Sequence, residues 1–374
     1  MSAAYRVAAR PLLALQDSEK AHGRTIRRLE RLGNSRLGRG LLSSLYSAPE
    51  LRIERFGIEF PNPLGLAAGM DKRAQALPAW PCIGFGFIEV GGVTAYAQAG
   101  NPKPRMFRDW KTRSLVNRMG FNNDGAAETA ARMEQTMQQG LWPKVPVAVN
   151  IGRSKITSNE DAAEDYLQTI EACWKYADML IINVSSPNTP DLHQLQQQAE
   201  LRGLLEACIS KNQECALHAD LEARPLLVKV SPDLTDEQLA AIARLARTLK
   251  LAGIVATNTT TTRPEIDQEK SKQVMSQQGG LSGAPLRERS TEVIRLLYQE
   301  TEGQLPIIGV GGISNVEDAW EKITNGACLL QLYSALIFEG PSVAKNIVRG
   351  LKRKLKQHHL DSLDQAVGSA VIRV

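Results

Sequence analysis

The segment MLIINVSSPNTP, residues 179–190, decides the fold class of this chain. It begins as a run of apolar, partly β-branched residues and becomes polar at Asn183. A short apolar run that ends in turn-forming residues is typical of a strand buried on both faces. The polar loop beyond it, which contains Ser185 and Ser186, is therefore a candidate place for chemistry.

The same pattern recurs along the chain and predicts a barrel. Helix-like stretches, such as 161–176, 236–249 and 288–299, separate most of the apolar runs. Eight buried strands alternating with helices are typical of a (β/α)8 TIM barrel of the α/β class. A doubly wound open sheet is the alternative, but the count of eight favours closure. The expected strands are 63–68, 87–90, 145–151, 179–184, 226–230, 253–256, 306–310 and 328–332.

Composition agrees with one large globular domain. The chain has 374 residues, of which 43% are hydrophobic, and a formal net charge of +5. No apolar run approaches the roughly 20 residues that span a bilayer, and we find no signal-peptide pattern. The five cysteines form no C-x-x-C pair, so we expect reduced thiols and no metal site.

The N-terminal segment is basic and amphipathic. Residues 1–40 contain nine Lys or Arg against three acids. Tyr5, Leu12 and Leu13 lie on one stripe of a first short helix, and a second is expected over residues 19–32, ending at Gly33. Such helices can pack on the barrel or lie in a membrane interface, and the pattern alone favours packing. We therefore divide the chain into an extension (1–48), a barrel (49–360) and a tail without assigned role (361–374).

The residues that end the strands indicate the chemistry, because active sites of such barrels lie at that end. They are amides, lysines, hydroxyls and glycines, with no histidine and no carboxylate pair, which argues against metal-dependent hydrolysis and glycoside cleavage. Glycines after the seventh strand suit a phosphate group. The set suits a flavin mononucleotide, and the long segment 94–123 is expected to cover the barrel mouth.

Several motifs, in this order along the chain, resemble the dihydroorotate dehydrogenase family. The resemblance extends from about residue 19 to residue 351, and the serine-containing loop and the extension resemble class 2, the membrane-associated, quinone-dependent branch. It implies FMN-dependent oxidation of dihydroorotate to orotate in pyrimidine biosynthesis, with one FMN per chain. The motifs are AAGMDK (67–72), NPKPRMFR (101–108), NRMGFNN (117–123), NVSSPNT (183–189), VKVSPDL (228–234), ATNTT (256–260), GGLSG (279–283), IIGVGGI (307–313) and QLYSA (331–335).

The resemblance also implies roles for individual residues. Ser186 would be the base that removes the C5 proton while hydride passes from C6 to the flavin N5, and a serine needs a relay for this. Lys229 would stabilise the reduced flavin. The implied substrate-binding residues are Lys72, Asn117, Arg118, Met119, Gly120, Phe121, Asn183, Asn188, Asn258 and Thr259. The implied cofactor-binding residues are Ala68, Gly69, Met70, Asp71, Lys72, Gly92, Asn150, Asn183, Lys229, Thr257, Gly283, Gly312, Tyr333 and Ser334.

For the extension, the resemblance favours the membrane interpretation. His22, Arg108 and Tyr333 match positions that line a quinone tunnel in class 2. We expect a monomer that binds dihydroorotate, a membrane quinone and anionic lipid, with no metal and no nucleic acid. It would lie peripherally on the cytoplasmic face of a bacterial inner membrane.

The chain departs from the family pattern at three places. Gly92 replaces a usual Ser or Thr, Arg153-Ser154 follow the third strand, and Asp191-Leu192-His193 follow the serine loop. Alternatives are a soluble fumarate- or NAD-linked flavin dehydrogenase, a tRNA-dihydrouridine synthase and a non-catalytic barrel. The first class typically has cysteine at the base position, and the second would bind nucleic acid with steep salt dependence.

Overall fold

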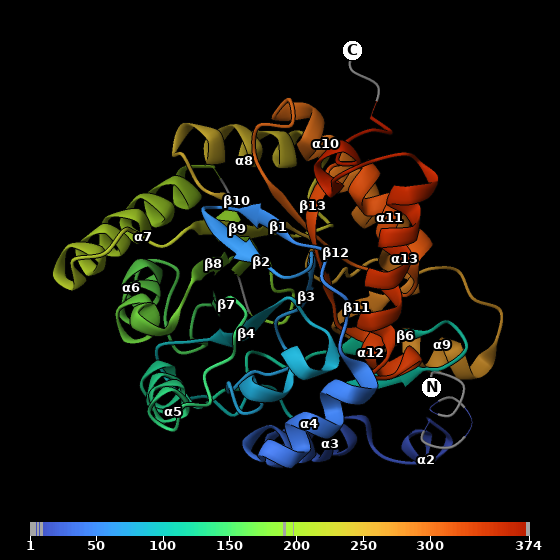
Figure 1. Cartoon of the computed structure of the whole chain (residues 1–374). Helices are drawn as coiled ribbons and strands as arrows, with labels where there is room; N and C mark the ends of the chain where they lie inside the picture. The colour runs from blue at the N-terminus through green and yellow to red at the C-terminus, as the bar shows by residue number, and fades with distance from the viewer. Residues whose placement is uncertain (1–4, 6, 8–9, 190–191, 197, 372–374) are drawn as a thin grey trace.

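Eight parallel strands form a closed barrel in the computed structural model, which describes residues 5, 7, 10–189, 192–196 and 198–371 (Figure 1). Closure is made where Leu330 on the last strand pairs with Leu64 on the first. The eight expected strands are thus confirmed, and the open sheet is excluded. In chain order the strands are β3 (Leu64–Leu66), β4 (Phe87–Val93), β7 (Val147–Ile151), β8 (Met179–Asn183), β9 (Leu226–Val230), β10 (Gly253–Ala256), β12 (Ile307–Val310) and β13 (Ala327–Leu332).

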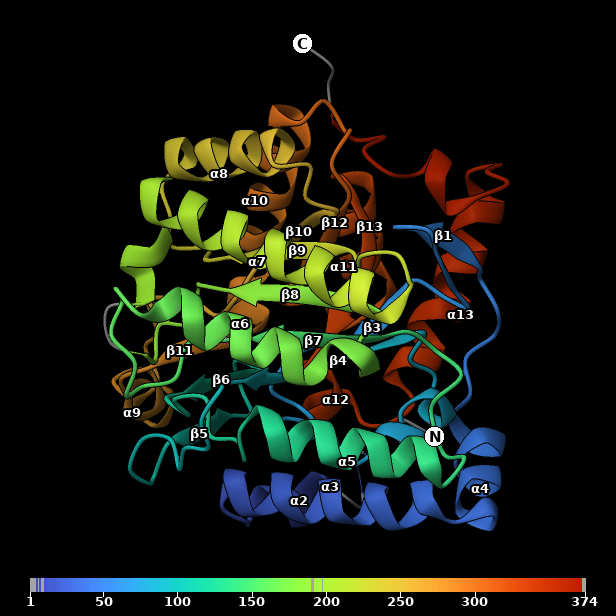
Figure 2. The ribbon, with the colours of Figure 1, turned by 90° about the vertical axis from the view of Figure 1, so that its left-hand side faces the viewer.

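Helices surround the barrel because each buries an apolar stripe against the strands (Figures 1 and 2). In α8, for example, Leu239, Ile242 and Ala243 are buried, and Thr235 caps the helix in a capping box with Gln238. The helices around the barrel are α5 (Ala126–Gln138), α6 (Ala162–Cys173), α7 (Gln198–Ala219), α8 (Asp236–Thr248), α10 (Arg287–Glu300), α11 (Val316–Thr324), α12 (Ser334–Glu339) and α13 (Val343–Gln357). The short helix α9 (Glu269–Met275) packs instead against β5 (Met106–Asp109), outside the barrel.

A small antiparallel sheet stands over one side of the barrel mouth. It combines β5 (Met106–Asp109) and β6 (Ser114–Asn117) with β11 (Gly280–Gly283), and Val116, Met275 and Leu281 form its own small core. The sequence predicted an elaborated segment over 94–123 but not its pairing with a strand more than 160 residues away, as in the Gly280–Asn117 pair.

The N-terminal helices pack on the loops that follow β3 and β4. They are α2 (Arg10–Ala14), α3 (Ser18–Asn34) and α4 (Arg36–Tyr46), and Figure 2 shows them along one side of the barrel next to α5. Helix α3 ends at Asn34, close to the predicted end. The sequence did not predict α4, which begins at once because Ser35 caps both the end of α3 and the start of α4.

The opposite end of the barrel is closed by a hairpin and by the C-terminal residues. The hairpin consists of β1 (Ile53–Arg55) and β2 (Ile58–Phe60). Arg55 forms an ion pair with Asp364, and Leu363 and Ala366 are buried. The described part of the tail therefore packs on the barrel, a contact for which the sequence offered no expectation. Short 3-10 turns complete the fold at Leu77–Ala79, Pro81–Ile83, Trp174–Tyr176, Leu192–Gln196, Ala284–Leu286 and Leu363–Gln365.

Candidate active site

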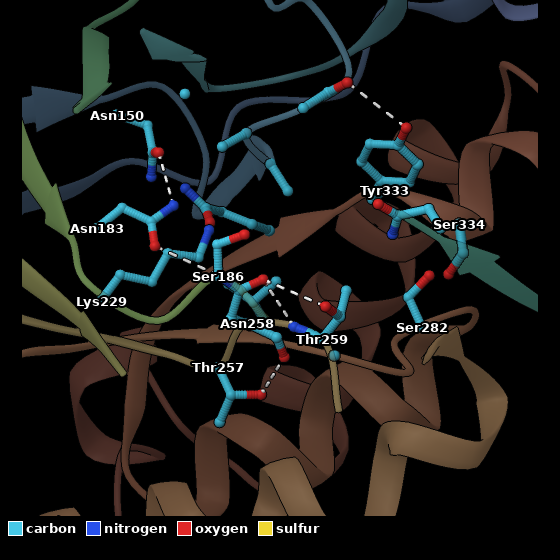
Figure 3. A pocket seen from close by; sticks show the side chains of 18 of the residues that line it. Asn150, Asn183, Ser186, Lys229, Thr257, Asn258, Thr259, Ser282, Tyr333 and Ser334 are labelled. Carbon is cyan, nitrogen blue, oxygen red and sulfur yellow. Dashed lines mark hydrogen bonds between the residues drawn. The ribbon is translucent and has the colours of Figure 1, made fainter. Parts of the chain in front are cut away.

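A cavity lies at the C-terminal ends of the barrel strands, and most of the residues expected to bind cofactor or substrate line it (Figure 3). No histidine and no carboxylate is among its described lining residues, so its ionisable groups are Lys72, Lys229 and Tyr333. The expected residues in the lining are Ala68, Gly69, Lys72, Gly92, Asn117, Met119, Gly120, Phe121, Asn150, Asn183, Ser186, Asn188, Lys229, Thr257, Asn258, Thr259, Gly283, Gly312, Tyr333 and Ser334.

Three expected residues are not part of this lining. The Asp71 carboxylate accepts hydrogen bonds from the backbone of Gln75 and Ala76 and from Trp80 Nε1, so it fixes the loop after β3. Met70, like Asp71, lines a second cavity instead. The Arg118 guanidinium donates to the carbonyl oxygens of Pro104 and Gln278.

The sequence assigned no role to seven residues of the lining, and Gln331 is the one with the most chemical interest. It stands inside the apolar run of β13, one residue before the last residue of the strand, Leu332. A glutamine in such a run signals a polar partner in the barrel interior, because a buried amide without hydrogen bonds is costly. The seven are Ala67, Ser282, Leu286, Val310, Gly311, Ile313 and Gln331.

Ser186 stands on the loop that leaves β8 and is 9% exposed. Its Oγ accepts a hydrogen bond of 3.3 Å from the backbone N–H of Asn188. The Asn188 side chain in turn donates to Asn117 Oδ1 at 3.3 Å, and Asn101 donates to the Asn188 carbonyl oxygen. The loop is therefore held against the segment that covers the mouth, with the serine hydroxyl directed into the cavity (Figure 3).

The two lysines differ in their surroundings. Lys72 donates to the Gly69 carbonyl oxygen at 2.9 Å, and burial lowers the pKa of Lys72 to about 8. Lys229 lies deeper and pairs with Glu89 at 3.3 Å, both side chains being nearly inaccessible. Lys72 is thus a cation close to its titration point, which an anionic ligand would keep charged.

One side of the cavity is built of glycines and helix starts. A Cβ on Gly312 (φ +73°) would lie 2.5 Å from Arg287 Cα, so only glycine lets these backbones approach. Gly312 and Ser334, which begins α12, both line the cavity. Their backbone groups suit an anion, as expected for the segment after the seventh strand. On the opposite side Asn150, Asn183 and Lys229 stand together (Figure 3).

The departures from the family pattern have a structural setting. A Cβ on Gly92 would lie 2.6 Å from the Phe121 ring, so this ring fills the space that a Ser or Thr side chain would need at position 92. The Ser154 Oγ accepts from the Tyr96 backbone N–H, and the Ser154 N–H donates to Asp165. Gly92 therefore concerns packing within the cavity lining, and Ser154 concerns packing of the loop after β7 beside it. Asp191 and the His193 side chain lie outside the described residues.

The residues expected to line a quinone tunnel do not share one described cavity. Tyr333 lines the cavity above, and burial raises the pKa of its hydroxyl. His22 lines the second cavity, between α3 and the loop after β3, where burial lowers its pKa to about 3 and keeps it neutral. Arg108 donates to the carbonyl oxygens of Leu13 and Gln16, at the link between α2 and α3. Their role in quinone access stays a prediction.

Comparisons with known proteins agree with this geometry. The family model described as dihydroorotate dehydrogenase matches residues 50–355. A relative from Cyanothece sp., named dihydroorotate dehydrogenase (quinone), is 49% identical over 84% of this chain and 83% of its own. One of the same name from Gloeobacter violaceus is 45% identical over 98% of this chain and 99% of its own.

Solved structures give the same answer. The crystal structure of a dihydroorotate dehydrogenase from Eimeria tenella in complex with ferulenol superposes with a TM-score of 0.80 at 36% identity. It covers 90% of this chain and 95% of that one. Family model, relatives and fold agree over nearly the whole length. The chain belongs to the dihydroorotate dehydrogenase family.

Proposed function

We propose that this chain is a quinone-dependent dihydroorotate dehydrogenase that uses FMN to oxidise dihydroorotate to orotate in pyrimidine biosynthesis. The observation that carries the proposal is the cavity itself, in which Ser186, two lysines and a set of amide side chains meet at the C-terminal end of the barrel. The relatives named for this activity match the chain at 42–49% identity over most of its length.

The described residues fit FMN. The backbone N–H groups of Gly312 and Ser334 suit the FMN phosphate. Lys229 and Asn150 offer hydrogen-bonding groups for the imide part of the flavin ring. Gln331 Oε1 is buried without a protein partner among the described residues, and a flavin carries N–H and ribityl O–H donors that can satisfy it. FMN bound there supplies the two-electron chemistry that links substrate oxidation to the acceptor.

The substrate side follows from the remaining groups. Lys72 holds the carboxylate of dihydroorotate, and Asn117, Asn188 and Asn258 bind the amide edges of its ring, since carboxamides offer both donors and acceptors. Ser186 removes the proton from C5. No carboxylate or imidazole of the described residues lines the cavity, so the proton passes from Ser186 to solvent.

We also propose that the N-terminal helices place the protein on the cytoplasmic face of a bacterial inner membrane, with the quinone entering beside them. Leu12, Leu15, Leu37 and Leu41 are 65%, 87%, 86% and 56% exposed, and exposed leucines gathered in one segment suit a lipid interface. Across the described residues, no helix has the length and hydropathy needed to cross a bilayer. The relatives given above come from cyanobacteria.

The experiment that tests the proposal compares electron acceptors. Purified protein in detergent is given dihydroorotate with a short-chain quinone, fumarate or NAD, and orotate is measured. Turnover with quinone alone supports the proposal. Turnover with fumarate or NAD instead would assign the chain to a soluble class. The exposed leucines would then not be explained by contact with a membrane. The absence of orotate with any acceptor would refute the proposal.

A further inference from the structure

Glu89 is a buried carboxylate that holds three side chains of the cavity without lining it. It stands in the middle of β4 and is 0% exposed. Its Oε1 accepts from Asn150 Nδ2 at 2.6 Å and from Lys229 Nζ at 3.3 Å, and its Oε2 accepts from Gln331 Nε2. The three donors come from β7, β9 and β13, so one carboxylate ties four strands together beneath the cavity.

The surroundings of Glu89 supply both of its carboxylate oxygens with hydrogen-bond donors. A buried carboxylate is costly unless it is paired and its oxygens are hydrogen-bonded. Here a lysine and two amide groups supply the partners, and each of them donates.

Because a carboxylate only accepts, Glu89 fixes the direction of the amides in series. Asn150 must turn its NH2 group toward Glu89, and its Oδ1 then accepts from Asn183 Nδ2 at 2.8 Å. The Oδ1 of Asn183 in turn accepts from the Ser185 backbone N–H at 3.2 Å and from the Ser185 hydroxyl at 3.0 Å. The series of hydrogen bonds with fixed direction therefore extends from Glu89 to Ser185, the residue next to Ser186. Figure 3 shows the Asn150–Asn183 bond of this series.

Gln331 is oriented by the same rule. Its NH2 group is committed to Glu89, so its Oε1 is left as a buried acceptor without a protein partner among the described residues. Were the amide reversed, two acceptors would face each other at Glu89, which is unfavourable. Glu89 therefore decides that Gln331 offers an acceptor to a bound group.

We propose that Glu89 is a positioning residue that orders the amide side chains of the cavity and offsets the charge of Lys229. Its carboxylate keeps Asn150, Asn183 and Gln331 in one orientation and places a negative charge beside Lys229, a buried lysine of the cavity lining. The flavin potential is consequently lower than an unpaired Lys229 would make it. The inference rests on the proposed function, since it takes the bound group to be FMN.

The substitution Glu89→Gln tests this, because it keeps the shape and removes the charge and one acceptor. In the holoprotein we expect a midpoint potential of the bound FMN more positive than in the wild type. We also expect the Kd for orotate to rise on the order of five- to tenfold, as for one lost hydrogen bond. A purely structural role would lower stability without moving the potential.

Asp178→Asn is the matched control. The Asp178 carboxylate accepts from the Val147 backbone N–H at 2.7 Å, at the start of β7 and thus at the other end of the barrel. This variant should lose stability and keep the wild-type potential. A shift as large as that of Glu89→Gln would show that any weakened barrel changes the potential, and would overturn the inference.

Two further variants keep the test decisive if Glu89→Gln fails to retain FMN. In Lys229→Met combined with Glu89→Gln no unpaired buried charge remains, and its potential should still exceed that of Lys229→Met alone. Equal potentials in each pair of proteins that retains FMN would overturn the role of Glu89 and leave the proposed function intact. A wild type that binds no FMN would overturn both.

Discussion

Arg105 and Glu19 form an ion pair with two hydrogen bonds, 2.7 and 3.1 Å long, that fastens helix α3 to the segment leading into β5. Arg105 is only 6% exposed, and it also donates to the carbonyl oxygens of Ala99 and Asn101. One arginine thus connects the N-terminal helices to the cover of the barrel mouth.

Glu19→Gln should therefore loosen α3. It leaves a buried guanidinium without its anion, and we expect a loss of about 1.5–3 kcal/mol in the free energy of unfolding, measured by urea denaturation. Glu50→Gln is the control, because Glu50 pairs with Arg52 on the surface, where both side chains are more than half exposed. It should cost less than about 1 kcal/mol.

The same pair predicts a pH dependence. Burial opposes the charge of Glu19, but Arg105 and Lys103 outweigh it and hold the pKa of Glu19 below its ordinary value. A lowered folded-state pKa contributes stability above the unfolded pKa, about 4.3, and this is lost as the pH falls through the folded value. The difference between wild type and Glu19→Gln should vanish in acid, and a constant difference at all pH values would contradict the pairing.

Ser186→Ala should retain FMN and slow its reduction by dihydroorotate by about 10²–10⁴-fold, as for the loss of a general base. Stopped-flow absorbance under anaerobic conditions measures this. The neighbouring Ser185→Ala removes a hydroxyl that donates to Asn183, and should cost about tenfold or less. An unchanged rate in Ser186→Ala would take the base role away from Ser186.

Binding of orotate should weaken at alkaline pH. Burial is the main cause that lowers the pKa of Lys72 to about 8, with Glu19 the largest opposing charge. The free enzyme loses this cation above that pH, so the Kd for the anion should rise up to about tenfold per pH unit. Titration of the flavin spectrum with orotate between about pH 6 and 10 measures it. Lys72→Gln should give weak, pH-independent binding; an unaltered profile would point to another group.

Leu37→Glu with Leu41→Glu should detach the protein from membranes. Both leucines are mostly exposed on α4, so stability should hardly change, whereas insertion of each leucine into lipid would contribute about 1.5–3 kcal/mol. Flotation with anionic vesicles should show at least a tenfold loss of binding. Leu217→Glu, 80% exposed on α7, is the matched control and should bind as the wild type.

The strands were predictable because each is an apolar run that ends in turn residues, and residues 253–256 match β10 at both ends. The sheet β5–β6–β11 was not, because the GLSG strand contains two glycines and pairs only through the folded barrel. Helix α4 was not predicted because Gly38 and Gly40 lower its helix propensity. In the folded chain, the cap by Ser35 and packing onto the loop after β3 compensate for this.

The site was predictable where its residues end strands and hidden where they stand inside them. Ser186 and Asn258 follow apolar runs, and Lys229 is a charged residue next to the end of one, so the strand ends indicate all three. Glu89 and Gln331 lie within such runs and point inward, where local sequence does not reveal their partners. The available signal was that a polar side chain inside an apolar run needs a hydrogen-bonding partner in the barrel interior.

The most direct test of the account is an anaerobic titration of the purified, FMN-containing protein with dihydroorotate, followed by flavin absorbance and by orotate. The account predicts that dihydroorotate bleaches the flavin and yields one orotate per FMN, and that a short-chain quinone restores the colour. A flavin that stays oxidised in excess dihydroorotate would contradict the assignment of this cavity to dihydroorotate oxidation.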